Sequence, residues 1–307
     1  MKRLTLFFVF FILFSACNLV TKKETQVADL TGTEGLIITL PKIPSEMYVG
    51  QGLEIPITLE NLGAHKVKNG VLSIVGFNED FVKFNQAPKI EGINLDGKTN
   101  FLPGERTTKV FTINSVSLPE EKQREESFEV IACYQYETIA IPIACINPQS
   151  QTGVQVVKGS CEFVDAQLST SQGAPLAVTK VENWYYLESK EVEFRIYLKD
   201  VSGKGSILAK ESYAKFCLSN TELNSEDFNK INIEAYMGTQ EMRCSPIGGS
   251  VGPSFTLLEN SPAVTCRASI DFDKPSYTTP LSLYLTYGYA TRVGFKITLK
   301  NPSYVSK

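Results

Sequence analysis

The stretch Glu54-Ile-Pro-Ile-Thr-Leu-Glu-Asn-Leu-Gly63 alternates apolar and polar side chains and closes with residues suited to a turn. Alternation at period two predicts a strand with one buried face. Segments rich in Val, Ile, Phe, Tyr and Thr repeat this pattern between turns that bear Gly, Asn, Asp and Pro: Gly52–Leu59, Gly70–Phe77, Thr107–Ile113 and Ser127–Tyr136. The sequence therefore predicts an all-β fold of antiparallel sheets, as sandwich or barrel. The one helix that we expect is short and lies in Thr221–Asn232, with Ser225 as its cap.

The opening strand has a counterpart later in the chain, Glu193-Phe-Arg-Ile-Tyr-Leu-Lys-Asp-Val-Ser202. A second pair of matching segments, Tyr134-Gln-Tyr-Glu-Thr138 and Tyr287-Gly-Tyr-Ala-Thr291, follows in the same order. The offset is 139 residues from position 54 to 193 and 153 residues from 134 to 287, so the second copy carries about fourteen extra residues. Two landmarks in one order predict two tandem copies of a β-domain; a single large sandwich is the alternative.

Composition sets the boundaries between these copies. The polar stretch around Pro148 and Gly153 is suited to a short linker, and residues 18–33 are poor in large apolar side chains. The predicted organisation is a signal segment 1–17, a tether 18–33, a β-sandwich 34–148, a linker 149–160 and a second β-sandwich 161–307. In this arrangement the tether sets the first domain off from the membrane, and the second domain lies farther along the chain.

The first copy resembles a known family at two places. Asn61-Leu-Gly63 closes the opening strand with an N-x-G turn, and Leu102-Pro-Gly-Glu105 precedes the strand Thr107–Ile113. Both features resemble CARDB-type immunoglobulin-like modules of prokaryotic surface proteins. The segment Gln172–Lys180 is similar to part of surface proteins from small-genome archaea. This resemblance implies immunoglobulin-like sandwiches used for adhesion, spacing or surface assembly, and it implies no catalytic residue. The second copy lacks a Pro-Gly-Glu counterpart and belongs only through the internal repeat.

The N-terminus has the order of a secretory signal. Lys2 and Arg3 precede the uncharged run Leu4–Phe14, and small residues then lead to Cys17. Eleven helical residues would extend about 16 Å, roughly half of a hydrocarbon core, so a spanning helix is not expected. Small residues before a cysteine resemble the lipobox of bacterial and archaeal lipoproteins, in which that cysteine carries the lipid. The resemblance implies a membrane partner through a lipid on Cys17 and an extracytoplasmic location. A plain signal peptide with an incidental cysteine is the alternative.

Six further cysteines form an even set, which in an exported chain predicts disulfides. We expect Cys133 to pair with Cys145 across a hairpin that turns near residue 139. In the second copy three pairings are open, of which we favour Cys244–Cys266 with Cys161–Cys217. Buried free thiols are the alternative.

The sequence gives little support for catalysis, for a bound cofactor or metal, or for nucleic-acid binding. The formal charge is −3 without a Lys/Arg cluster, which argues against nucleic acid. The only histidine, His65, follows a turn and is expected to be exposed, and one histidine excludes multi-histidine metal sites and the usual catalytic triad. Asp271 and Asp273 would share one face of a strand, most simply a solvated one. We therefore expect no enzyme activity, no cofactor and no metal, with a small exported hydrolase as the alternative from another class.

Aromatic residues are the better candidates for contact with a partner. Trp184, Tyr185 and Tyr186 form the densest cluster, and a second group contains Tyr284, Tyr287 and Tyr289. Exposed aromatic rings bind glycans or proteins, whereas buried ones fill sandwich cores. The sequence predicts a lipid-anchored surface protein with a structural or binding role. An adhesin that binds glycan or protein through Trp184–Tyr186 is the alternative.

Overall fold

The computed structural model describes residues 29–115, 118, 122–148, 161, 166–218, 223–246, 254–257 and 264–302. Strands make up nearly all of the regular structure in these residues, and almost every pair of neighbouring strands is antiparallel. The prediction of an all-β antiparallel fold is confirmed. The signal segment, Cys17 and the linker 149–160 lie outside the described residues.

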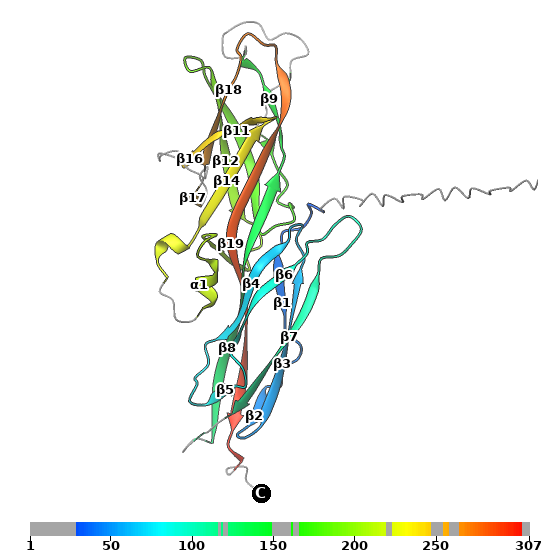
Figure 1. Ribbon diagram of the computed structural model, residues 1–307, viewed down its shortest axis with the longest axis vertical. Coiled ribbons are helices and arrows are strands. Elements are labelled where there is room, and N and C mark those ends of the chain that lie inside the picture. Colours follow the sequence, from blue (N-terminus) through cyan, green and yellow to red (C-terminus); the bar gives the residue numbers. More distant parts are fainter. Residues whose placement is uncertain are drawn as a thin grey trace, which may run out of the picture.

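Two strands run along the length of the molecule and pair with each other (Figure 1). They are β8 (Gln123–Ala140) and β19 (Tyr277–Lys300), with the register running unbroken from Ala140–Leu283 to Gln123–Lys300. Period-two alternation places one face of each strand in the core, as the burial of Phe128, Val130 and Tyr134 shows. A pair of this length gives the molecule its elongated shape.

The largest sheet is built on these two strands, in the order β15-β14-β19-β8-β4-β6, and four short strands attach at its margins. Its other members are β2 (Glu46–Tyr48), β4 (Val67–Val75), β6 (Lys89–Leu95), β9 (Ile143–Ile146), β13 (Gly205–Leu208), β14 (Lys230–Met237), β15 (Gln240–Glu241) and β17 (Ser254–Thr256). Among the described strands, the one parallel pair joins β2 to β19.

Two smaller sheets lie one in each half of the sequence. The first has the order β1-β3-β7-β5, and the second has the order β10-β11-β12-β18-β16. Their strands are β1 (Leu36–Thr39), β3 (Gly52–Asn61), β5 (Val82–Phe84), β7 (Arg106–Ser115), β10 (Ala166–Gln167), β11 (Leu176–Tyr186), β12 (Glu191–Asp200), β16 (Arg243–Pro246) and β18 (Val264–Ser269). Buried side chains of all three sheets belong to one continuous hydrophobic cluster.

The matched segments of the internal repeat occupy corresponding places in the structure. β3 and β12 are inner strands of the two small sheets, and each is followed across its sheet by one strand and a short edge strand. The two tyrosine segments lie directly against each other, with Tyr134 opposite Tyr289 and Tyr136 opposite Tyr287. The large sheet nevertheless runs through both halves, so the division into two tandem immunoglobulin-like sandwiches is not confirmed.

The helix predicted for Thr221–Asn232 is wrong. Among its described residues, 223–232, only a 3-10 turn, η2 (Ser225–Asp227), forms; Asn224 caps it, and strand β14 begins at Lys230. The sequence analysis missed the short helix α1 (Tyr213–Cys217). Both elements lie between β13 and β14, which pair with the same edge of β19 at Gly288 and Thr286. β13 and β14 therefore follow one another along the same edge of β19, and the segment that connects them accounts for the additional residues of the second half.

All six cysteines predicted to form disulfides do so, but two of the three predicted pairings are wrong. Cys244–Cys266 is confirmed, and the two residues lie directly opposite each other on β16 and β18. The other bridges are Cys133–Cys217 and Cys145–Cys161. A Cys133–Cys145 bridge required a hairpin turn near residue 139, yet β8 continues through this position to pair with β19.

The bridge Cys133–Cys217 attaches α1 to the outer face of the large sheet. Both cysteines are buried, in a small apolar cluster with Val71, Ile131 and Tyr213. The chain's three disulfides indicate an oxidising, extracytoplasmic environment. Neither of the helices in the described part of the chain has the length and apolar character needed to cross a membrane.

The two turns that carried the family resemblance contact each other. The backbone N–H of Asn61 donates to the carbonyl oxygen of Glu105, at 3.0 Å. The Asn61 side chain is fully buried; it donates to the carbonyl oxygens of His65 and Leu95, and it accepts from the N–H of Gly63. The backbone bond therefore holds the turn after β3 against the turn before β7, and the side-chain amide joins the turn after β3 to the end of β6.

Gly104 is required at this contact because a side chain would collide with backbone. A methyl group there would lie 1.6 Å from the carbonyl oxygen of Asn61. We expect Gly104→Ala to lower the free energy of unfolding by about 2–4 kcal/mol, because the two turns would have to move apart to make room for the methyl group. Urea unfolding with the disulfides intact measures this loss. Gly294→Ala is the matched control, since its methyl would meet the nearest atom at 3.6 Å, an ordinary contact. Equal stability of the two variants would contradict the assignment.

Candidate binding surface

The predicted aromatic cluster is divided between two faces of β11. Trp184 and Tyr186 lie on the outer face of the five-stranded sheet, with exposed fractions of 50% and 37%. Tyr185 lies between them in sequence and therefore points to the opposite, inner face. The prediction that the three residues form one patch holds only for Trp184 and Tyr186.

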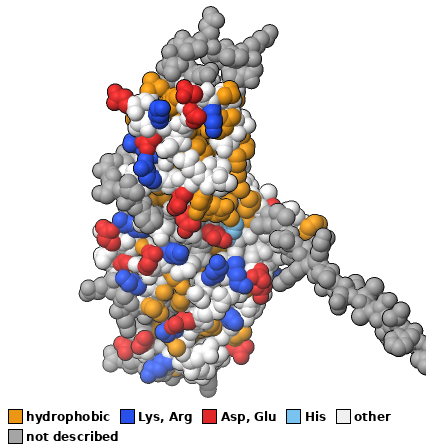
Figure 2. Space-filling view, turned by 45° about the horizontal axis from the view of Figure 1, so that its top comes forward, with side chains coloured by type: hydrophobic (Ala, Val, Ile, Leu, Met, Phe, Trp, Pro, Cys, Tyr) orange, Lys and Arg blue, Asp and Glu red, His pale blue; other side chains and the backbone are white. Residues whose placement is uncertain are grey.

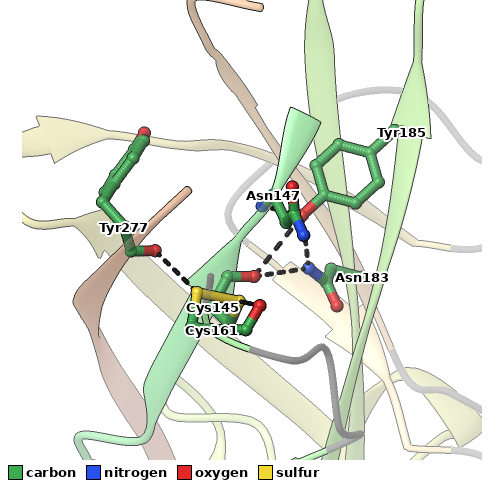
Figure 3. Close-up of a disulfide and its surroundings, with 6 residues drawn as sticks. All are labelled: Cys145, Asn147, Cys161, Asn183, Tyr185 and Tyr277. Carbon is green, nitrogen blue, oxygen red and sulfur yellow. Dashed lines mark hydrogen bonds between the residues drawn. A yellow bond between two sulfur atoms is a disulfide. The ribbon is translucent and has the colours of Figure 1, made fainter. Parts of the chain in front are cut away.

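Tyr185 belongs to the surroundings of the Cys145–Cys161 disulfide (Figure 3). Its hydroxyl accepts from the backbone N–H of Asn147 at 2.9 Å and donates to the carbonyl oxygen of Cys145 at 3.4 Å. Asn183 also donates to that carbonyl oxygen, at 3.2 Å. Burial raises the pKa of Tyr185, so the ring stays neutral in this structural role.

Arginine side chains hold the two exposed rings in place. The Arg195 guanidinium lies 4.2 Å from the centre of the Trp184 ring, and that of Arg267 lies 4.8 Å from the Tyr186 ring. Trp184, Glu193 and Arg267 stand side by side on three neighbouring strands. Cation–π stacking on a sheet restricts the rings to few orientations, so the surface is preorganised for contact.

Glu193 connects the two arginines beneath the rings. One carboxylate oxygen accepts from Arg195 Nε at 3.2 Å, and the other accepts from Arg267 Nε and Nη2 at 2.8 and 2.7 Å. The Tyr186 hydroxyl donates to the same carboxylate at 3.3 Å. Burial of Glu193 acts to raise its pKa, but hydrogen bonds from Arg267 and Arg195 outweigh burial and lower it.

Several residues that the sequence analysis considered for catalysis, metal binding or partner contact differ from the prediction in their burial or secondary structure. His65 is buried rather than exposed, with Nδ1 3.2 Å from a carboxylate oxygen of Glu137. Asp271 and Asp273 lie in a turn, not on a strand, and Asp271 accepts the backbone N–H of Asp273. Tyr287 and Tyr289 are core residues, whereas Tyr284 is 37% exposed. Within the described residues, no three His, Cys, Asp or Glu side chains converge as metal ligands would.

Two exposed apolar features were missed in the sequence. Ile141 and Ile143, at the junction of β8 and β9, are 52% and 61% exposed. Figure 2 shows that apolar side chains gather along one side of the upper half of the molecule. Phe101 and Leu102, between β6 and β7, are 80% and 51% exposed. Their position beside the Pro-Gly-Glu turn was the available signal, because tight turns project their neighbours into solvent.

Comparisons with known proteins give no family and no function. No family model matches the sequence, and no curated protein matches it. Among solved structures, E. coli alpha-2-macroglobulin is 15% identical with a TM-score of 0.23, over 37% of this chain and 8% of that chain. A DUF4466 family protein from Parabacteroides merdae is 10% identical, with a TM-score of 0.16, over 83% of this chain and 99% of that chain.

The CupB6 tip adhesin from Pseudomonas aeruginosa is 11% identical, with a TM-score of 0.17, over 90% of this chain and 99% of that chain. Superpositions this poor carry no argument about fold or function. The chain spans only 8% of the length of the macroglobulin.

The state of Glu193 can be followed through Trp184, because both contact Arg195. The folded-state pKa of Glu193 lies below the ordinary value of about 4.3 that it has in the unfolded chain. Its contribution to the free energy of unfolding is therefore complete above about pH 4.3, and it is lost as the pH falls through the lower, folded value. We expect the Trp184 emission to change in that acidic range. In Glu193→Gln the carboxylate is absent at every pH, so this transition should disappear. An unchanged emission titration in Glu193→Gln would show that the network does not set the ring's environment.

Proposed function

We propose that this chain is an exported, non-catalytic surface protein, held on the outer face of a membrane by a lipid on Cys17. Its two halves are immunoglobulin-like units fused through β8 and β19, and it binds a protein partner through Trp184 and Tyr186. The three disulfides support export, because they form and persist outside the reducing cytoplasm.

The strand order supports the two-unit organisation. In the first half β3 pairs with β7, which pairs with the edge strand β5; in the second half β12 pairs with β18, which pairs with β16. The contact between the turns at Asn61 and Glu105 also fits the resemblance to CARDB-type modules, since the N-x-G and Pro-Gly-Glu turns hydrogen-bond to each other. Such modules act in adhesion and surface assembly.

The exposed pair Trp184 and Tyr186 carries the binding role. Trp, Tyr and Arg are the residues most enriched at the energetic centres of protein interfaces, and this face combines all three on neighbouring strands. Glu193 fixes the arginines, so little conformational entropy is lost when a partner covers the rings. A glycan-binding adhesin would use the same two rings. No specific observation favours the hydrolase alternative.

The anchor is tested by the mass of the protein extracted from membranes with detergent. We expect a chain that begins at Cys17 and carries a diacylglyceryl group, because two acyl chains give stable anchoring. Cys17→Ser should abolish the lipid and release the protein from the membrane fraction. A mature mass that still contains residues 1–16 would contradict the anchor.

The binding face is tested by chemical cross-linking on intact cells. We expect the native chain to form a cross-linked species with a protein, and Trp184→Ala to lower its yield about tenfold or more, as loss of an interface centre does. Val110→Ala, at a 45% exposed site on β7, should leave the yield unchanged. Thermal unfolding of both variants checks that they fold. Equal yields from the three chains, or no cross-linked species from the native chain, would refute this role.

A further inference from the structure

We propose that the tip of the β6–β7 loop, Phe101 and Leu102, inserts into the head-group layer of the membrane that holds the chain. The molecule is then attached by its middle, with a second contact beside the lipid. This inference rests on the proposed lipid at Cys17 and adds the orientation of the protein on the lipid surface.

The chain enters the fold between the two halves, not at one end. On one side the N–H of Asp29 donates to the carbonyl oxygen of Lys98, and Lys98 Nζ lies 3.3 Å from an Asp29 carboxylate oxygen. On the other side the N–H of Gly173 donates to the carbonyl oxygen of Gly32, at 2.8 Å. Glu34 pairs with Lys204 at 2.7 Å. The last residues of the predicted tether are therefore part of the folded body.

Covalent geometry limits how far this point lies from the lipid. Twelve steps of the chain lead from Cys17 to Asp29, and a fully extended chain advances at most about 3.6 Å per residue, or about 43 Å in total. Residues 29–33, the last five of the predicted tether, include direct contacts with both halves of the fold, through Lys98 and Gly173. The described chain begins near the middle of the long axis of the molecule (Figure 1).

The apolar loop tip lies close to this entry point. Phe101 is only three residues beyond Lys98, a distance of at most about 11 Å along the chain. Figure 1 shows the start of the described chain and the β6–β7 loop projecting on the same side of the molecule. Leu30, 37% exposed, adds a third apolar side chain there. The segment that leads to Cys17 joins the fold beside this loop, so the loop lies on the side of the molecule that the proposed anchor ties to the membrane.

The loop presents Phe101 and Leu102 in a fixed turn. The N–H of Thr99 donates to the carbonyl oxygen of Leu102 at 2.9 Å, and the Thr99 hydroxyl accepts from the N–H groups of Leu102 and Phe101 at 3.0 and 3.3 Å. Phe101 is the most exposed large apolar side chain of the described residues, at 80%. Water is an unfavourable environment for such a tip, whereas an aromatic and an aliphatic side chain suit the boundary between head groups and acyl chains.

The charges beside the tip favour an apolar contact over an electrostatic one. Lys98 pairs with Asp29, and Asp96 pairs with Lys66 at 2.7 Å. Each pair contains one basic and one acidic side chain, so these pairs have no net positive charge that would select anionic lipids. We therefore expect insertion to depend little on salt or on the fraction of anionic lipid.

A single tryptophan at the tip reports insertion directly. The six other cysteines are bridged, so Cys17 of the mature chain, residues 17–307, can be coupled alone to a maleimide lipid in phosphatidylcholine vesicles that contain a brominated phosphatidylcholine. In the variant Phe101→Trp with Trp184→Phe, we expect a blue-shifted emission and about twofold quenching by the bromine atoms. The otherwise native chain, with Trp184 as its only tryptophan, is the control and should show no quenching.

Two outcomes would overturn the proposal. Emission at the wavelength of a tryptophan in water, from a protein that floats with the vesicles, would show that the tip stays in solution. A blue shift without bromine quenching, together with a dimer in sedimentation, would show that a second copy of the chain covers the tip. Because the lipid is attached chemically, neither outcome depends on whether the cell modifies Cys17, which the mass measurement decides separately.

Discussion

The unbroken pairing of β8 with β19 is the interaction on which the rest of the structure depends. Strands from the two halves of the sequence share one ladder, with every residue from Gln123 to Ala140 placed opposite one from β19. Ordering such distant segments costs chain entropy that the ladder and the core on its inner face must offset together. The two halves therefore stabilise each other at this seam, although each has its own small sheet.

Buried tyrosine hydroxyls reinforce the same seam. The Tyr134 hydroxyl accepts from the N–H of Leu36 at 2.9 Å, Tyr136 donates to Asn61 at 3.2 Å, and Tyr287 shares a hydrogen bond with Thr138 at 3.0 Å. Burial raises the pKa of Tyr134 and Tyr287 well above the ordinary value, so both rings stay neutral and keep their hydrogen bonds. A buried hydroxyl without a partner costs about 1–3 kcal/mol, so each bond fixes the position of its neighbour.

This seam also determines the geometry of the proposed membrane attachment. Residues 29–34 lie against both halves, so an anchor at Cys17 would hold the middle of an elongated molecule rather than one tip. The loop with Phe101 lies beside this attachment, whereas Trp184 and Tyr186 lie on the outer face of the second small sheet. In the proposed function, one region contacts lipid and a separate region is left exposed for a partner.

The sequence by itself determined the local features, because they depend on neighbours along the chain. Period-two alternation located β3, β7 and most of β8, and the turn residues located both turns that meet at Asn61. The even number of cysteines indicated disulfides, and the repeated tyrosine segments turned out to lie opposite each other on β8 and β19. Cys244–Cys266 could be favoured from the sequence because the two residues are close along the chain, with Gly and Pro residues between them.

Only the tertiary structure decided which distant segments meet. Whether β8 turns back at residue 139 or continues beside β19 is not encoded in local pattern, since both strands alternate in the same way; this choice determined the partners of Cys133 and Cys145. Alternation also could not say which of Trp184 and Tyr185 faces solvent, because the inner face is defined by the sheet that covers it. The position of the N-terminal segment between the halves depends on the β8–β19 seam, and no property of residues 29–34 alone reveals it.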